Sequence, residues 1–390
     1  MSFIKKIRKS LIEKRFFKTL FNKLYPYYKG FLLVFLFQKN KIQIFSPKKS
    51  VIEKKDIPLA ERIFKSFKNM KSHQENKSKL YKPSSMWQDH IDQDFKFMND
   101  SVNQNDLEKF LFFLQNFGNW DRYLGIENQK LIKGYSRNFI LNKYLKDEIF
   151  YSRHELWKFI TQKNDISYLD FPKYGNQNGA YIDDTFVNLG SFFDDIYANI
   201  IKNFLQNNQK NIIIDLGAGY GKLSYYITKN LSNTTLVDID IPETLCLASF
   251  YLSKCYPKKR NFFFGEGNIG SDTLKNYDLI FLPSWEIEKI SDDSIQLVVN
   301  KNSLGEMDPN AAENYLKHIH RISKYFFSMN HEFFKNKFNN NNTSLINSQF
   351  NKNRNFKELI RYPDLGHLIY KNNKINFKSD IFFYLYEKIS

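Results

Sequence analysis

The chain has 390 residues, of which 42% are hydrophobic, 17% aromatic and 25% charged, and it carries a net charge of +17. This balance excludes a disordered tail protein, a collagen-like chain and a disulfide-stapled mini-protein, and at ~150 residues per domain the length predicts roughly two to three domains. The two cysteines, Cys246 and Cys255, suffice for neither a CxxC pair nor a cysteine zinc site. We expect both to be buried thiols in a reducing compartment.

The positive charge is concentrated at the amino-terminal end. Residues 1–60 hold 15 Lys and Arg but only 3 Asp and Glu, which is +12 of the net +17. In Phe3–Leu24 apolar residues recur at helical spacing between basic ones, a pattern typical of a membrane-surface helix and also of a helix docked on the protein's own core. No run reaches the ~18 apolar residues of a membrane span. We expect a cytoplasmic protein, and peripheral contact with the inner face of the membrane through residues 1–45 is the open alternative.

Residues 61–205 are predicted to be mainly helical and rich in aromatic residues, without a strong chemical motif. Leu107–Phe117 is a dense apolar run, and Phe192–Leu205 is predicted as a helix that leads into the next domain. The turn-rich Gly175–Gly179 segment indicates a domain boundary or an active-site loop.

From residue 206 onward, predicted strands alternate with predicted helices. The strands are expected at Asn211–Leu216, Thr234–Ile239, Asn261–Phe264, Asp278–Pro283, Ile295–Asn300 and Tyr325–Met329, and the helices at Leu223–Leu231, at Pro242–Tyr256 and from Asp308 onward. Residues 336–355 contain nine asparagines, which mark a mobile loop or an insertion. Ile381–Tyr386 is predicted as a last strand at the edge of the sheet.

This alternation predicts an α/β fold, in which a mostly parallel Rossmann-like sheet is flanked by helices and preceded by a mainly helical region. The predicted organisation is a basic amphipathic segment at 1–60, a helical region at 61–205 and a ligand-binding domain at 206–390.

The strongest chemical signal is a glycine motif directly after a predicted strand. Its sequence is Asp215-Leu216-Gly217-Ala218-Gly219-Tyr220-Gly221. A dinucleotide fingerprint needs its third glycine at position 222, which is Lys222, so a nicotinamide dehydrogenase is disfavoured. The (D/E)xGxGxG spacing instead resembles the first motif of class I S-adenosylmethionine-dependent methyltransferases. The resemblance implies that Asp215, Gly217, Gly219 and Gly221 hold the methionyl part of this cofactor.

Two carboxylates end the next predicted strand, at Asp238 and Asp240. A carboxylate about twenty residues past such glycines can accept both ribose hydroxyl protons. The Asp240-Ile-Pro-Glu run is similar to the Asp-Leu-Pro of many small-molecule O-methyltransferases, which makes Asp240 the preferred ribose ligand and Asp238 the reserve. Either residue is also suited to cap the following helix.

A third motif, NxxSxxEM, is formed by Asn300, Ser303, Glu306 and Met307. Together with the glycine motif and the Asp-Ile-Pro-Glu run, it makes the stretch from Asp215 to Asn330 resemble a sugar O-methyltransferase family of bacterial polysaccharide gene clusters. The resemblance implies methyl transfer from S-adenosylmethionine to a sugar hydroxyl of a nucleotide-sugar or lipid-linked glycan in surface polysaccharide biosynthesis. It also implies a place for Asn300 in the cofactor site.

The resemblance extends more loosely upstream. Ser85-Met86-Trp87 and the Gly175-Asn176 loop look like landmarks of the family, although Gln177 stands where a proline is expected. By this resemblance residues 61–205 form the acceptor-side lid and residues 206–390 the methyltransferase domain.

Further candidate residues follow other predicted strands. Trp285 comes after Asp278–Leu282, where it can stack on adenine or simply pack in the core. A general base assists a sugar hydroxyl, and Glu306 and His331 both follow strands at the expected ligand edge. Because histidine titrates nearest neutral pH, His331 is the favoured base, although a structural role fits either residue.

We predict no metal site. Asp183-Asp184 and Asp194-Asp195 are acidic pairs, and adjacent carboxylates on a helix or turn are expected to face solvent.

Two other classes of function stay open. The charge of +17 suggests a nucleic-acid methyltransferase, but no RNA-binding module is visible and the excess lies in the first 60 residues, so we expect no nucleic-acid partner. A non-catalytic cofactor-binding or scaffold protein of a glycan assembly complex is the second alternative, and the intact glycines and carboxylates argue against it. The expected partner is a sugar or glycan acceptor, either diphosphate-linked or membrane-attached.

Overall fold

The computed structural model describes residues 24, 25, 28, 42–122, 124–126, 139–205, 210–353, 355–364 and 380–389, and for 139–149 it describes the backbone alone. The predicted amphipathic helix Phe3–Leu24 lies outside the described residues, apart from Leu24. In the part of the chain that is described, no helix is both long enough and apolar enough to cross a membrane.

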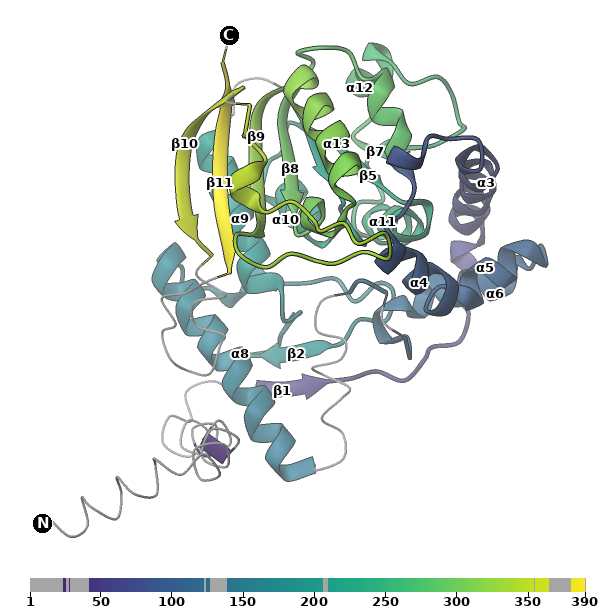
Figure 1. Cartoon of the computed structure of the whole chain (residues 1–390). Coiled ribbons are helices and arrows are strands. Elements are labelled where there is room, and N and C mark those ends of the chain that lie inside the picture. Colours follow the sequence, from purple (N-terminus) through teal and green to yellow (C-terminus); the bar gives the residue numbers. More distant parts are fainter. Residues whose placement is uncertain are drawn as a thin grey trace, which may run out of the picture.

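An eight-stranded sheet with the order β10-β11-β9-β8-β4-β5-β7-β6 forms the centre of the molecule (Figure 1). Its strands are β4 (Asn211–Leu216), β5 (Thr234–Asp240), β6 (Asn261–Phe263), β7 (Leu279–Pro283), β8 (Ile295–Lys301), β9 (Ser323–His331), β10 (Phe356–Pro363) and β11 (Ile381–Lys388). All pairings among β4 to β9 are parallel, and β11 runs antiparallel to both of its neighbours.

The parallel strands form because their apolar residues are buried on both faces. Ile214 of β4 pairs with Val237 of β5 and Val298 of β8, and all three side chains are fully buried. One face is covered by α9 (Ser191–Phe204), α10 (Lys222–Asn230) and α11 (Pro242–Cys255), and the other by α12 (Ser271–Asn276) and α13 (Pro309–Ile322) (Figure 1). The predicted Rossmann-like α/β fold is confirmed.

The edges of the sheet differ from the prediction. Ile381–Tyr386 was expected at an edge, but β11 lies between β9 and β10, because its side chains are buried on both faces. The edge strand is instead β10, which is largely exposed. Its sequence, FKELIRYP, shows neither a continuous apolar run nor a regular alternation of apolar and polar residues, so it was not predicted as a strand. At the opposite edge the order is β5-β7-β6, so β7 lies beside β5.

The region before β4 is mainly helical. It contains α3 (Ile57–Gln74), α4 (Ser85–Gln93), α5 (Lys96–Asn103), α6 (Leu107–Asn116) and α8 (Phe139–Thr161). A small antiparallel sheet of β1 (Ile42–Phe45), β2 (Gly179–Ile182) and β3 (Thr185–Val187) was not predicted. The boundaries at residues 60 and 205 stay predictions.

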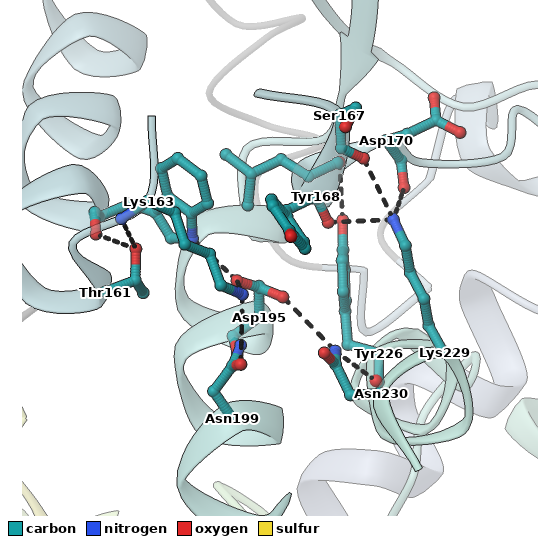
Figure 2. Close-up of polar contacts among 12 residues, drawn as sticks. Thr161, Lys163, Ser167, Tyr168, Asp170, Asp195, Asn199, Tyr226, Lys229 and Asn230 are labelled. Atoms are coloured by element: carbon teal, nitrogen blue, oxygen red, sulfur yellow. Dashed lines mark hydrogen bonds and ion pairs between the residues drawn. The ribbon is translucent and has the colours of Figure 1, made fainter. Parts of the chain in front are cut away.

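The acidic pair on α9 contradicts the expectation that it faces solvent. Asp195 is 1% exposed and accepts hydrogen bonds from Trp157 (2.8 Å), Lys163 (3.3 Å) and Asn230 (3.4 Å). Figure 2 shows the last two contacts, of which the one from Asn230 joins α9 to α10. The carboxylate is buried because α9 packs between α8 and α10, and these helices and the turn after α8 supply the donors.

Neighbouring contacts fix α10 from its other side. Tyr226 donates to the carbonyl of Leu169 (2.9 Å) and Lys229 to that of Tyr168 (2.9 Å) (Figure 2). The helix that begins at the glycine motif is therefore anchored by the region that precedes β4.

Of the two free cysteines, Cys246 is buried as expected and Cys255 is half-buried.

Candidate functional site

A cavity of about 270 Å³ opens at the carboxyl ends of β4, β5 and β8. Ligands of open α/β sheets gather at this edge. Two parts of the chain supply the wall: Asp215, 217–220, Lys222, Leu223, Asp240, Ile241, 301–303, 306–308, Ala311 and Tyr315 from the sheet domain, and 80–84, Trp87 and Gly125 from the region before it.

The glycine motif forms one side of the cavity. Gly217, Gly219 and Gly221 all have a positive φ, of 78°, 61° and 82°, which side chains rarely adopt. A Cβ on Gly217 would overlap Ser303, and one on Gly221 would lie 2.9 Å from Leu252. At Gly219 no atom lies within 4 Å of that position. Gly219 therefore leaves open space at the cavity wall, whereas Gly221 serves the packing beneath it.

Asp240 lies in the cavity wall beside these glycines. Its carboxylate accepts hydrogen bonds from the backbone N–H groups of Gly219 (2.7 Å) and Ile241 (2.7 Å). Burial raises the pKa of Asp240 to about 6, and the two backbone hydrogen bonds oppose this shift. Asp238, the reserve candidate, does not line the cavity and is 1% exposed beneath it.

Asn300 acts as a structural tie. Its amide donates to the carbonyl of Leu216 (2.8 Å), and its oxygen accepts from Leu304 N–H (3.1 Å) and from the Asn330 amide (2.9 Å). Asn300 is fully buried and absent from the cavity wall. It was predicted as a cofactor-binding residue, but the structure gives it the role of fixing the turn that carries Glu306.

Glu306 joins the two parts of the chain. Trp87 on α4 donates from Nε1 to Glu306 Oε2 at 2.8 Å, and both side chains line the cavity. Burial raises the pKa of Glu306 to about 7, while the Trp87 hydrogen bond and the nearby His90 oppose the shift. A carboxylate with this pKa is suited to take up a proton near neutral pH.

His331 and Trp285 lie outside the cavity wall. His331 Nδ1 is hydrogen-bonded to Asp380 Oδ2 at 2.7 Å, and the other Asp380 oxygen accepts from the N–H groups of Phe333 and Phe334. The ring therefore belongs to the β9–β11 corner of the sheet, and the structure does not support it as the base. Trp285 is 2% exposed and packs edge-on against Phe264, so it is a core residue.

An ion cluster behind the glycine loop was missed in the sequence. Asp194 is fully buried and pairs with Lys301 (2.6 Å) and Lys222 (3.3 Å), and both lysines line the cavity. The three residues come from α9, β8 and α10, so no local spacing indicates that they meet. Trp87 was noted only as a landmark, because nothing in the sequence connects it to a glutamate 219 positions away.

Among the described residues, no group of three or more His, Cys, Asp and Glu side chains is placed to hold a metal ion.

No family model and no curated protein matches the chain. Solved structures similar to it include a SAM-dependent methyltransferase from Aquifex aeolicus, with 13% identity over 50% of this chain and 89% of that one and a TM-score of 0.33. The mitomycin 7-O-methyltransferase MmcR has 9% identity over 63% and 71%, with a TM-score of 0.34. A Burkholderia thailandensis 1,6-didemethyltoxoflavin-N1-methyltransferase, solved with S-adenosylhomocysteine, has 12% identity over 50% and 79%, with a TM-score of 0.34. Likenesses this distant carry no conclusion about the ligand of this chain.

Proposed function

We propose that the chain is an S-adenosylmethionine-dependent methyltransferase. The observation that carries this proposal is the pairing of the open glycine position, Gly219, with the Asp240 carboxylate at one cavity wall. An unhindered backbone gives room for a ligand to approach closely, and a carboxylate at the end of the neighbouring strand suits ribose hydroxyls.

The charges of the cavity fit this cofactor better than a dinucleotide. Asp215, Asp240, Glu306 and Asp308 place four carboxyl groups in the wall, which favours a cationic sulfonium and ammonium and disfavours the diphosphate of a dinucleotide at the glycine loop. Lys222 and Lys301 share Asp194, so this ion cluster has one positive charge left for the carboxylate of an amino-acid moiety.

When bound, S-adenosylmethionine supplies an already activated methyl group, so the protein chiefly orients the acceptor and manages its proton. Glu306 is the residue suited to remove the proton of an acceptor hydroxyl, because its pKa of about 7 keeps a large ionised fraction at neutral pH. Trp87 holds one carboxylate oxygen and so fixes the direction of the other.

We propose a sugar hydroxyl as the acceptor, on a nucleotide-sugar or a lipid-linked glycan of surface polysaccharide biosynthesis. The NxxSxxEM resemblance supports this substrate class. So does the acceptor side of the cavity, where the apolar ring of Trp87 lies beside the carboxylate of Glu306. Such a site offers apolar surface and a hydrogen-bond acceptor to a sugar ring.

Calorimetric titration with S-adenosylmethionine and S-adenosylhomocysteine tests the cofactor. We expect micromolar binding that is weakened roughly 10- to 100-fold in Asp240→Ala, because hydrogen bonds to a charged group contribute about 1.5–3 kcal/mol. Asp272→Ala, an exposed aspartate on α12, is the control and is expected to leave binding unchanged. Well-folded wild-type protein that binds neither compound would contradict the proposal.

A further inference from the structure

One buried hydroxyl lies between two carboxyl groups beneath the glycine loop. Ser224 Oγ is 2.8 Å from Asp215 Oδ2 and 2.7 Å from Asp238 Oδ1. A serine hydroxyl has a single hydrogen and can donate to only one of these oxygens. If both aspartates were ionised, the other carboxylate would face the lone pairs of the Ser224 oxygen without a proton between them. The geometry therefore requires one additional proton in this trio.

The surroundings of the two aspartates decide which one carries that proton. Asp238 is 1% exposed, its Oδ2 has no hydrogen-bond partner, and the backbone of Gly221 covers that oxygen so closely that a Cβ there would lie 3.4 Å away. A buried carboxylate with one oxygen unpartnered and no cation beside it is disfavoured in its charged form. Burial accordingly raises the pKa of Asp238 well above its ordinary value.

Asp215 is 2% exposed and so nearly as buried as Asp238, but its neighbours differ. It lines the cavity, and Lys301 favours its ionised form, although burial raises its pKa to about 7. The charged groups that act on the trio are Lys301 from β8, Asp194 from α9 and Asp240 from β5, and Asp194 is itself neutralised by Lys222 from α10 and by Lys301. Among these groups, Lys301 is the cation that acts on the trio, and it favours the ionised form of Asp215.

We propose that Asp238 is a neutral acid that donates to Ser224, that Ser224 donates to Asp215, and that Asp215 presents the single negative charge of the trio to the ammonium group of the cofactor. The identity of that cationic ligand rests on the proposed function, but the sharing of the proton does not. Asp238 is then a positioning residue for Asp215, and the reserve assignment of Asp238 as a ribose ligand is replaced.

Infrared spectroscopy of ligand-free protein labelled with ¹³C-aspartate tests the proton directly. At about pH 8, where Glu306 and Asp215 are mostly ionised, we expect the carbonyl band of an un-ionised aspartic acid in the wild type. The band is expected to disappear in Asp238→Asn and to persist in Asp215→Asn. A wild-type spectrum without this band, or a band lost only in Asp215→Asn, overturns the proposal.

Binding of S-adenosylhomocysteine gives the second measurement on the same pair of isosteric variants. Because an asparagine amide can donate to Ser224 as the neutral acid does, Asp238→Asn is expected to bind within about threefold of the wild type, while Asp215→Asn binds at least about tenfold more weakly. A folded Asp238→Asn protein that loses binding overturns the proposal, and so does an Asp238→Asn chain that cannot fold. If the wild type shows the infrared band but binds no cofactor, the proposed function fails and the shared proton stands.

Discussion

Gly217 of the glycine motif packs against Ser303 of the NxxSxxEM motif. The substitution Gly217→Ala, which adds one methyl group, tests how tightly the two motifs are packed. A Cβ on Gly217 would meet the Oγ and Cβ of Ser303 well inside 3.0 Å, a separation that real Cβ contacts essentially never breach. Gly219 provides the matched control, because its φ is similarly positive and no atom lies near its Cβ position. Gly219→Ala thus carries the backbone strain alone, about 1–2 kcal/mol. Gly217→Ala adds an overlap of about 1–3 kcal/mol and is expected to destabilise by roughly 2–5 kcal/mol.

Urea unfolding of both variants, with Ser303→Gly completing a double-mutant cycle, measures the overlap. The Ser303 side chain makes no capping hydrogen bond, so Ser303→Gly removes no helix cap at this turn. We expect an interaction energy of about 1–3 kcal/mol between Gly217→Ala and Ser303→Gly. Equal losses of stability in the two alanine variants, or additivity within about 0.5 kcal/mol in the cycle, would refute the reasoning.

Two further predictions concern the charges of the site. Methyl-transfer rates are expected to rise with pH through about 7 as Glu306 loses its proton. In Trp87→Phe the midpoint of the pH–rate profile is expected to move upward, because a hydrogen bond that lowers the pKa of Glu306 is lost. An unmoved midpoint contradicts the role of Trp87. Asp194→Asn is expected to lower the free energy of unfolding by about 3 kcal/mol, because the buried Lys222 loses its partner. Asp293→Asn, which breaks an exposed ion pair with Lys388, is the control and should change stability by under about 1 kcal/mol in the same denaturation experiment.

The elements of the sheet domain were predictable where burial left a strong local pattern. Asn211–Leu216 was predicted with the bounds that β4 has, because a strand buried on both faces shows as a continuous apolar run. The start of α11 at Pro242 and of α13 after Asp308 followed from a proline in the first turn, and the Asp308 side chain caps the second of these helices at Asn310 N–H. β2, with the four residues GAYI, is too short to show a comparable pattern.

The candidate site was predictable only where its residues follow one another along the chain. Gly219, Asp240 and Glu306 were identified because each belongs to a local motif at the end of a strand. His331 also follows a strand, but its position there does not determine where the ring points, and Asp380 engages it 49 residues further along. Asp194 was misjudged because the packing of α9 against α8 and α10, which no local sequence shows, decides its burial.

The two sides of the cavity differ in how far they depend on local motifs and on long-range contacts. The cofactor side is built mainly by β4 and β5 with their following turns, so its residues appear as motifs. The turn with Glu306, which follows β8, is held by Asn300 and also by distant segments: Asn336 donates to the carbonyl of Gly305 (2.7 Å), and Trp87 donates to Glu306 itself.

The asparagine-rich segment also ties this turn to α4. Asn340 (2.8 Å) and Asn342 (3.2 Å) both donate to Asp308 Oδ2, and Asn339 N–H donates to the Ser85 hydroxyl (3.2 Å) at the start of α4. Residues 336–342, predicted as part of a mobile loop or an insertion, thereby link the proposed base to the helix that carries Trp87. Because the acceptor side depends on these long-range contacts, its specificity can differ between chains that share every cofactor motif, and for that reason the sequence indicates the cofactor more directly than the acceptor.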